Sequence, residues 1–362
     1  MLTFLTVALL VYGSMHLYGL GKAWLALPHS PALAAGLAVA GVVLTLSPFL
    51  VWFLEKRGWS TAAAASAWLA YLWMGFLFLF VCLGLLLDLG HGLAALLRLP
   101  WPLGEGAATG VAALVALVLV GYGFVEARHI RVEEVRIATP KLAAGQVTIA
   151  QVSDLHLGIM LGDRFLERVI DKLREIDPDI LVTTGDTLDS HSDDLAALAR
   201  RFRTYSPPLG TFAVTGNHEY LAGLESSLSF LRGAGFTILR GDAARVGGIV
   251  LAGVDDHGAA EPPLPAEDGF VVLLKHQPKV DGAEPFDLQL SGHVHGGQIF
   301  PFGYLTRLFY PVPTGLTVLG DGRRLYVSRG TGTWGPPLRL LASPEITLIT
   351  ITAAPRGPAG PP

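Results

Sequence analysis

The chain is poor in charge and in cysteine. Only 15% of its 362 residues are Asp, Glu, Lys or Arg, whereas 51% are hydrophobic and the mean hydropathy is +0.48. An ordinary soluble enzyme of this length is less apolar. The single cysteine, Cys82, lies in an apolar run, which excludes an internal disulfide and a thiolate cage for a metal ion.

Charge is scarcest before about residue 128. That region holds five basic and four acidic residues: Lys22, Lys56, Arg57, Arg98 and Arg128, and Glu55, Asp88, Glu105 and Glu126. Subtracting these from totals of 26 and 30 leaves 21 basic and 26 acidic residues in the rest of the chain. This mildly acidic remainder lacks the clustered positive charge of a nucleic-acid surface, so we expect no nucleic-acid partner.

Four apolar stretches of the N-terminal region contain no Asp, Glu, Lys or Arg. They cover residues 2–20, 33–54, 67–87 and 107–125. Each approaches or exceeds the roughly 20 residues that cross ~30 Å of hydrocarbon as a helix, the conformation that satisfies the backbone in lipid. We therefore predict a membrane domain of four transmembrane helices over residues 1–128, with the lipid bilayer as its partner.

The predicted spans also suggest an orientation. The first stretch has no basic segment ahead of it and three more follow, which favours a retained helix over a cleaved signal peptide. With the N-terminus inside, four basic residues are cytoplasmic and two are not: Lys56, Arg57, Arg128 and Arg131 against Lys22 and Arg98. The positive-inside rule then favours a multi-pass membrane protein with a cytoplasmic C-terminal domain.

Beyond Val132 the pattern changes to alternating strands and helices. Strands are predicted at residues 135–138, 147–152, 180–184, 211–215, 245–254, 270–274, 287–290, 325–328 and 346–351. Helices are predicted at residues 163–175, 195–202 and 224–231. This order predicts an α/β domain with a layered sheet core. The Pro/Gly-rich tail, residues 353–362, is predicted to be disordered.

Polar side chains gather directly after five of these strands. The candidates, in chain order, are Asp154 and His156, Asp186, Asn217 and His218, His276, and His293 with His295. Ligands in α/β domains bind at the carboxyl ends of strands, so we expect these side chains to converge. Carboxylate and imidazole together suit Mn, Fe or Zn better than Mg or Ca, and their number allows two ions. If the D-x-H and H-x-H segments are extended, both residues of each pair point the same way.

Simpler interpretations exist for each residue taken alone. A turn or helix cap accounts for Asp154 and Asn217, and a structural histidine accounts for His276. They do not account for the order of all five segments. Asp189 and Glu219 stay open between a structural role and support of the ligands beside them. The aromatic segment 299–310 fits core packing, or a border of the site that holds a lipid-like leaving group or touches the bilayer.

The series D-x-H, G-D-x-x-D, G-N-H-E, a later His and G-H-x-H, over residues 147–351, resembles the calcineurin-like metallophosphoesterase superfamily. Residues 292–298, followed by Arg329-Gly330 and Pro344-Glu345-Ile346, resemble its membrane-linked bacterial branch, and the apolar N-terminus resembles membrane proteins with such a domain. The resemblance implies an α-β-β-α sandwich over residues 129–352, a two-sheet core flanked by helices.

The resemblance also implies a role for each candidate residue. Asp154, His156 and His295 would hold one metal ion, Asn217, His276 and His293 a second, and the Asp186 carboxylate would bridge both. His218 would protonate the leaving group or stabilise charge there. Two divalent ions, with Mn favoured over Fe or Zn, would make hydroxide available near neutral pH for in-line attack on phosphorus.

The expected function is a membrane-anchored phosphohydrolase that cleaves a phosphate ester or phosphoanhydride in a small molecule, a lipid or a lipid-linked substrate. Protein partners are not indicated by the sequence. One alternative is a non-catalytic, metal-dependent scaffold or regulatory domain of a membrane protein. A transporter or channel is disfavoured, because the spans carry no charge and no evident pair of broken helices.

Overall fold

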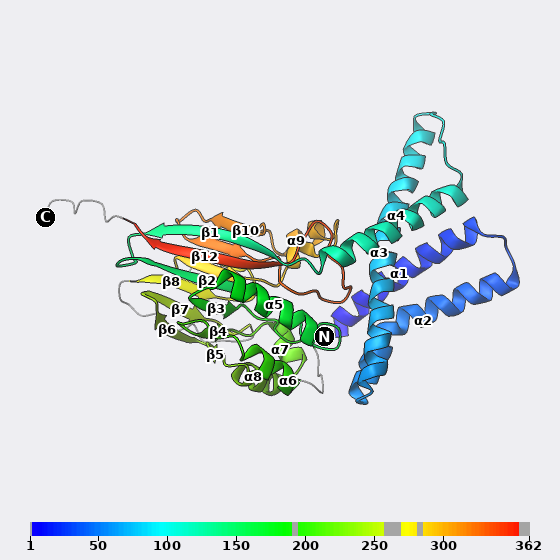
Figure 1. The fold of residues 1–362 in the computed structure, drawn as a ribbon. Helices are drawn as coiled ribbons and strands as arrows, with labels where there is room; N and C mark the ends of the chain where they lie inside the picture. The colour runs from blue at the N-terminus through cyan, green and yellow to red at the C-terminus, as the bar shows by residue number, and fades with distance from the viewer. Residues whose placement is uncertain (1, 190–194, 257–268, 281–284, 355–362) are drawn as a thin grey trace. The chain divides into compact units, whose positions relative to one another are not determined.

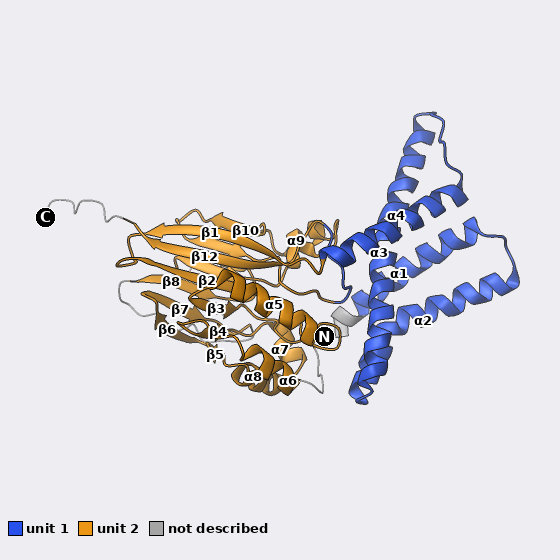
Figure 2. Cartoon of the chain, in the orientation of Figure 1, with its two compact units in different colours: residues 1–126, 335–340 blue, residues 127–334, 341–362 orange. Residues whose placement is uncertain are grey.

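The computed structural model describes the whole chain except residues 1, 190–194, 257–268, 281–284 and 355–362. The chain forms two compact units (Figure 2). One contains Met1–Glu126 together with Gly335–Leu340, and the other contains Ala127–Trp334 and Leu341–Pro362. Most of the tail that we expected to be disordered lies outside the described residues, while Ala353 is the last residue of a strand.

The first unit is built from four helices: α1 (Leu2–Ala26), α2 (Pro31–Lys56), α3 (Ser60–Leu96) and α4 (Glu105–Glu126). Within the described residues, α2, α3 and α4 are long and apolar enough to cross a membrane. α1 covers the first predicted span but is not among these three. Ser30 caps α2, because its hydroxyl accepts a hydrogen bond from the Leu33 amide at 3.0 Å.

Helix α3 is longer than its predicted span. We expected a break at Asp88, but the helix continues through it to Leu96. The Asp88 carboxylate is paired there with Lys22 and accepts a hydrogen bond from the Tyr18 hydroxyl at 2.7 Å. Lys22 also lies 3.2 Å from Glu105. Polar partners from α1 therefore let the charged residue stay within α3, and Lys22 connects it to Glu105 of α4.

A short segment from late in the chain, Gly335–Leu340, belongs to the helical unit. The Arg339 amide donates a hydrogen bond to the Gly123 carbonyl of α4 at 2.9 Å. Leu338 packs so closely on Gly75 of α3 that a Cβ there would overlap its side chain. The two glycines admit the segment between α3 and α4, an arrangement that we did not predict.

The second unit contains two mixed six-stranded sheets (Figure 1). The first has the order β1 (Arg131–Thr139), β12 (Glu345–Ala353), β2 (Gln146–Val152), β3 (Ile180–Thr183), β4 (Thr211–Ala213) and β5 (Thr237–Ile238). Strands β2 to β5 are parallel, so their carboxyl ends lie along one edge.

The second sheet has the order β10 (Gly315–Val318), β11 (Arg324–Val327), β9 (Leu288–Ser291), β8 (Phe270–Leu274), β7 (Ile249–Gly253) and β6 (Asp242–Val246). β7, β8 and β9 are parallel. Our prediction of one strand over residues 245–254 was wrong, because Gly247 and Gly248, both at positive φ, turn the chain between β6 and β7.

Apolar side chains from both sheets form one core between them. Ile149 of β2 and Val182 of β3 meet Leu251 of β7 and Leu290 of β9 in this layer, and all four are fully buried. The outer face of the first sheet is covered by α5 (Asp163–Ile176), α6 (Leu195–Phe202) and α8 (Leu224–Gly233). The fold class predicted from the sequence, an apolar helical region followed by an α/β two-sheet domain, is confirmed.

Candidate metal centre

The predicted ligands come from loops at the carboxyl ends of strands in both sheets. Asp154 follows β2, Asp186 follows β3, and Asn217 begins the short helix α7 (Asn217–Leu221) after β4. In the second sheet His276 follows β8, while His293 and His295 follow β9. The parallel runs align these ends, which is why residues more than a hundred positions apart meet.

The ligand loops have an unusual backbone. Nine described residues other than glycine have positive φ, and five of them are predicted ligands: Asp154, His156, Asp186, His293 and His295. The D-x-H and H-x-H segments are therefore not extended, so the condition under which their paired side chains would point the same way is not met, and His295 begins a 3-10 turn, η1 (His295–Gly297). Such conformations cost roughly 1–3 kcal/mol each and persist where surrounding contacts impose them.

Those contacts join the ligand loops to one another. The Asp154 amide donates to the Gly185 carbonyl and the His156 amide donates to the Asp186 carbonyl, both at 3.0 Å. The Asp154 carboxylate accepts a hydrogen bond from the His293 amide at 3.0 Å. Gly292 is required there, because a Cβ at this position would overlap the Asp154 carboxylate.

Glu219 organises two of the loops. Its fully buried carboxylate accepts hydrogen bonds from four backbone amides, those of Asp186, Thr187, Leu188 and Gly216, at 2.7 to 3.2 Å. We had left Glu219 open between a structural role and support of ligands. It does both, because it ties the turn of Asp186 to the turn of Asn217.

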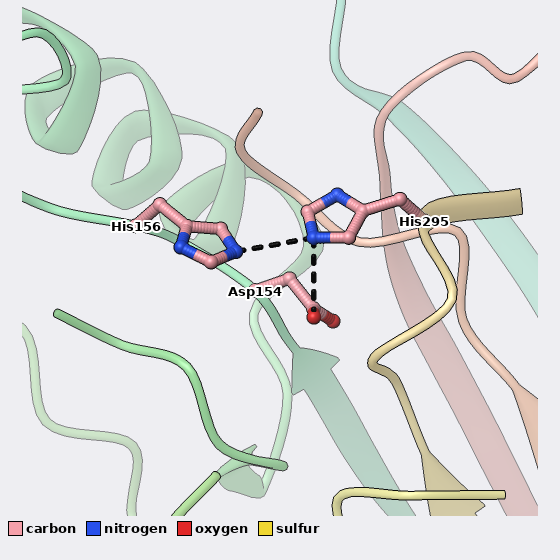
Figure 3. Close-up of side chains that lie close together, drawn as sticks. All are labelled: Asp154, His156 and His295. Atoms are coloured by element: carbon pink, nitrogen blue, oxygen red, sulfur yellow. Dashed lines mark hydrogen bonds and ion pairs between the residues drawn. The ribbon is translucent and has the colours of Figure 1, made fainter. Parts of the chain in front are cut away.

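The first ligand cluster contains Asp154, His156 and His295 (Figure 3). The two imidazoles face each other with their Nε2 atoms 3.1 Å apart, and His295 Nε2 lies 3.4 Å from Asp154 Oδ1. All three side chains are buried.

The second cluster contains Asp186, Asn217, His276 and His293. His276 Nε2 lies 3.1 Å from Asp186 Oδ2, 3.2 Å from Asn217 Oδ1 and 3.1 Å from His293 Nδ1. The other ring nitrogen, His276 Nδ1, donates to the Thr184 carbonyl at 2.8 Å. A neutral His276 therefore presents its Nε2 lone pair to three other acceptor atoms.

Asp186, a member of the second cluster, also lies close to the first. Its Oδ2 atom lies 3.1 Å from His276 Nε2 and 4.0 Å from His156 Nε2. Its Oδ1 atom is occupied, because it accepts a hydrogen bond from the His218 amide at 2.8 Å. One carboxylate oxygen thus lies near a ligand of each cluster.

Asp189 connects two histidines. Its Oδ1 atom lies 2.9 Å from His218 Nδ1 and 3.3 Å from His156 Nδ1. Both Nδ1 atoms thus lie next to a carboxylate, which favours the tautomer with hydrogen on Nδ1 and leaves Nε2 available for a cation or a substrate. For His156 that atom points into the first cluster. Asp189, which we had left open, orients a candidate ligand and the candidate proton donor together.

Sequence reasoning missed one wall of the site. Trp334 packs edge-on against His218 with ring centroids 5.7 Å apart, and about half of its surface is exposed. The Gln298 amide holds its backbone, donating to the Trp334 carbonyl and accepting from the Trp334 amide, each at 2.9 Å. The available signal was that Trp334 is the one tryptophan outside the N-terminal region.

Arg329 and Glu345, part of the pattern that resembled the membrane-linked branch, form a supporting ion pair. Their closest atoms lie 2.7 Å apart, and Glu345 is buried. The Tyr326 hydroxyl donates to Glu345 at 2.8 Å. These contacts join the end of β11 to the start of β12 and are not part of the ligand clusters.

Burial and opposite charges shift the proton affinities of the site. Burial lowers the pKa of His276, but the charge of Asp186 outweighs it and raises this pKa to about 10. Burial raises the pKa of Asp186, yet the charge of His276 holds it well below its usual range. Burial and the charge of His276 lower the pKa of His293 to about 3. Without a metal ion, the His276–Asp186 pair therefore favours an imidazolium beside a carboxylate at the point where the ligand atoms converge.

This donor set fits divalent metal ions. In the second cluster, two carbonyl-type oxygens and two imidazole nitrogens converge on one point, and such acceptors repel one another unless a cation lies between them. Mixed carboxylate and imidazole ligands are typical of transition-metal sites. The clustered Asp and His residues therefore indicate divalent metal binding.

Comparison with known proteins agrees with this geometry. The family model described as calcineurin-like phosphoesterase matches residues 147–297. A metallophosphoesterase of Aquifex aeolicus, itself described as uncharacterized, is 41% identical over 254 residues, which cover 66% of this chain and 97% of that protein. The chain belongs to the calcineurin-like phosphoesterase family.

Other relatives extend the likeness beyond this domain. The transmembrane protein with metallophosphoesterase domain of Danio rerio is 32% identical over 314 residues, covering 77% of this chain and 70% of that protein. Among solved structures, a 5'-nucleotidase precursor of Thermus thermophilus matches with 15% identity and a TM-score of 0.32, covering 57% of this chain and 54% of that one. The chain is therefore a metal-dependent phosphoesterase. Its apolar helices and its likeness to the Danio rerio transmembrane protein suggest membrane association.

Proposed function

We propose that the chain is a membrane-anchored phosphohydrolase that uses two divalent ions to cleave a phosphate ester or phosphoanhydride. The observation that carries the proposal is the position of Asp186 Oδ2, which faces His156 on one side and His276 on the other. In this proposal Asp154, His156 and His295 hold one ion, Asn217, His276 and His293 hold the other, and Asp186 bridges them. When bound, the ions would neutralise phosphoryl oxygens and make water a stronger acid.

The protein's own groups supply orientation and a proton. His218 has its Nδ1 atom on Asp189, so a protonated ring has its Nε2–H free to donate to the oxygen that leaves phosphorus. Burial disfavours the protonated His218 ring, but the nearby Asp189 and Asp186 carboxylates outweigh burial and raise the pKa of His218 to about 9. His218 therefore carries the proton at neutral pH. Trp334 shields the same ring from water on one side.

Manganese is the ion that we favour, with iron and zinc as alternatives. The sites combine three kinds of donor, namely carboxylate, amide oxygen and imidazole, and Mn accepts all of them. The single cysteine, Cys82, lies in α3, far from these residues in the sequence, so it does not add a thiolate to this set of donors. Metal content of the purified protein measures this choice directly.

Membrane anchoring and a lipid-like substrate form the finer part of the proposal. Its supports are the three long apolar helices and the likeness to the transmembrane protein with metallophosphoesterase domain of Danio rerio. A further support is the segment 299–310. Its Ile299 is buried, but six of its large apolar or aromatic side chains are exposed rather than packed in the core: Phe300, Phe302, Tyr304, Leu305, Leu308 and Phe309. The excess of basic residues in the expected inner loops favours a catalytic domain on the cytoplasmic face.

Substitution of the bridging carboxylate tests the reaction. We expect Asp186→Asn to lower the turnover of a chromogenic phosphodiester, measured with Mn supplied, by at least about a thousandfold, because both ions lose a charged ligand. Asp171→Asn, which makes the same change on the exposed face of α5, is expected to keep full activity. Folded wild-type protein that binds Mn but turns over no phosphoester would favour a non-catalytic scaffold instead.

A substrate screen tests the finer part. Purified full-length protein with Mn is offered lipid phosphates, nucleotide-linked lipids and soluble nucleotides, and phosphate release is measured with Asp186→Asn as the blank. Preference for the lipid classes would support the proposal, and exclusive turnover of soluble nucleotides would contradict its lipid component.

A further inference from the structure

Tyr310, the residue that directly follows α9 (Gly303–Phe309), contacts a predicted metal ligand from the side opposite to the ligand cluster. Its hydroxyl oxygen lies 2.8 Å from His293 Nε2 and 3.0 Å from Gln277 Oε1. The rings of Tyr310 and His293 meet edge-on with centroids 5.0 Å apart. Tyr310 is the last residue of the aromatic segment 299–310, whereas Gln277 was not singled out in the sequence.

The direction of each hydrogen bond in this chain follows from its far end. The Gln277 amide NH2 group, which can only donate, gives a hydrogen bond to Asp256 Oδ1 at 2.9 Å. Gln277 Oε1 then faces Tyr310 and can only accept. The Tyr310 hydroxyl therefore donates its one hydrogen bond to Gln277 Oε1, and its oxygen accepts a hydrogen bond from His293.

His293 must therefore carry its hydrogen on Nε2. A neutral imidazole has one N–H, so its Nδ1 atom presents a lone pair. That Nδ1 atom lies 3.1 Å from His276 Nε2, inside the cluster that also contains Asp186 and Asn217. The chain from Asp256 through Gln277 and Tyr310 thus selects the tautomer in which His293 can ligate a cation through Nδ1.

We propose that Tyr310 is a positioning residue that, with Gln277 and Asp256, fixes the tautomer and ring orientation of His293 for the second metal ion. The inference rests on the proposed function only in assigning His293 to that ion. Without the hydroxyl acceptor, the tautomer with hydrogen on Nδ1 becomes accessible, and it turns a donor toward the cation. Outer partners of this kind typically change metal affinity by about 10- to 100-fold.

Tyr310→Phe is a clean test because it removes one oxygen atom. The ring remains, and with it the edge contact to His293 and the position of Lys279, whose Nζ lies 5.5 Å from the ring centroid. Tyr304→Phe is the matched control, since Tyr304 lies on α9 with its side chain mostly exposed and its ring against Phe300. Gln277→Leu is a second test, because it removes the acceptor that fixes the hydroxyl hydrogen.

The measurement is equilibrium binding of Mn to the full-length protein by calorimetry, with bound Mn counted after desalting. Wild type and Tyr304→Phe are expected to bind two ions. In Tyr310→Phe and Gln277→Leu one of the two sites is expected to weaken about 10- to 100-fold while the other is unchanged. Turnover of Tyr310→Phe is expected to recover at high Mn, whereas Asp186→Asn is not rescued.

The possible outcomes separate this inference from the proposed function. Unchanged affinity at both sites of Tyr310→Phe overturns the role of Tyr310 and leaves the two-ion site intact. A wild-type protein that binds one ion or none overturns the two-ion proposal itself, and the inference with it. Weakening of both sites equally, without rescue by Mn, shows a general structural defect and also overturns the inference.

Discussion

At the scale of single residues, the site depends on where hydrogens lie on its imidazoles. Three of them are oriented by an acceptor on the side away from the working nitrogen: Asp189 for His156 and His218, and the Thr184 carbonyl for His276. Each acceptor fixes a tautomer, and each fixed tautomer leaves a nitrogen for a cation or for substrate. The chemistry of the site is therefore set as much by these acceptors as by the ligands.

The His218–Asp189 pair predicts a pH dependence. Only protonated His218 can donate to the leaving oxygen, and its pKa is raised to about 9, so kcat is expected to fall as pH rises through that value. Asp189→Asn removes the adjacent charge, so the pH at which kcat falls should move down toward the ordinary histidine pKa of about 6.5. A complete shift would cost roughly 30-fold in kcat at pH 8, and the charge of Asp186, which remains, makes the loss smaller than that. A kcat profile from pH 6 to 10 at saturating Mn measures both.

The same pair has a defined effect on stability. Because the pKa of His218 is higher in the folded protein than in the unfolded chain, the stabilisation that its protonated form provides is complete below about pH 6.5 and is lost as pH rises through about 9.

In the kcat profile, His218→Asn should show no fall in kcat on the alkaline side. If the fall of kcat at high pH persists unchanged in Asp189→Asn, another group is the proton donor.

At the scale of elements, the segment from Ile299 to Tyr310 behaves differently from the rest of the domain. Helix α9 has no buried residue. Its apolar side chains Leu308 and Phe309 are 75% and 78% exposed. One of our two interpretations of this segment, core packing, is therefore wrong for its helical part. The segment instead presents an apolar surface and ends at Tyr310, beside His293.

This surface predicts a selective effect on lipid substrates. Replacing Phe302 and Phe309 by Ser should leave turnover of a soluble phosphodiester unchanged, because neither side chain is buried in the core. For a lipid-linked phosphate we expect kcat/KM to fall about tenfold or more, since burying a Phe side chain contributes roughly 1.5–3 kcal/mol. Val318→Ser, at an exposed position on β10, is the control. Equal kcat/KM values in the double variant and the wild type would exclude contact of this surface with the lipid.

At the scale of the whole molecule, the ligands lie where two sheets bring their strand ends together. Asp154, Asp186 and Asn217 come from the first sheet, and His276, His293 and His295 come from the second. An ion held between them joins the two sheets across the buried core. Such an ion binds the folded state and not the separated loops of the unfolded chain, so it must stabilise the fold.

Metal removal is therefore expected to lower thermal stability. An ion present at about 100 times its Kd stabilises by about 2.7 kcal/mol, which corresponds to a shift in Tm of roughly 5–10 °C for a domain of this size. Thermal unfolding of the purified protein with Mn and with EDTA measures the shift. Asp186→Asn should show a much smaller difference between the two conditions. An identical Tm in Mn and EDTA for the wild type would contradict binding between the sheets.

The sequence by itself determined the apolar helices, most strands and the order in which candidate ligands follow them. These features depend on local hydrophobic period and on residue type, which are visible along the chain. The left-handed backbone of Asp154 and His293, the hairpin at Gly247 and Gly248, and the extension of α3 past Asp88 were not predicted, because contacts with distant segments impose or permit them.

Tertiary structure alone decided which groups support the site. Glu219 belongs to the G-N-H-E segment and Tyr310 to the aromatic segment 299–310, but neither pattern shows what the side chain contacts. The partners that give Glu219, Tyr310 and Trp334 their roles lie 17 or more residues away in the chain, apart from the capping contact of Glu219 with Gly216. Proton positions on an imidazole depend on the acceptor that it meets in space, and strand order brings that acceptor there. The sequence is enough to predict which residues are candidate ligands, whereas the orientation and tautomer of their rings depend on contacts that form only in the folded chain.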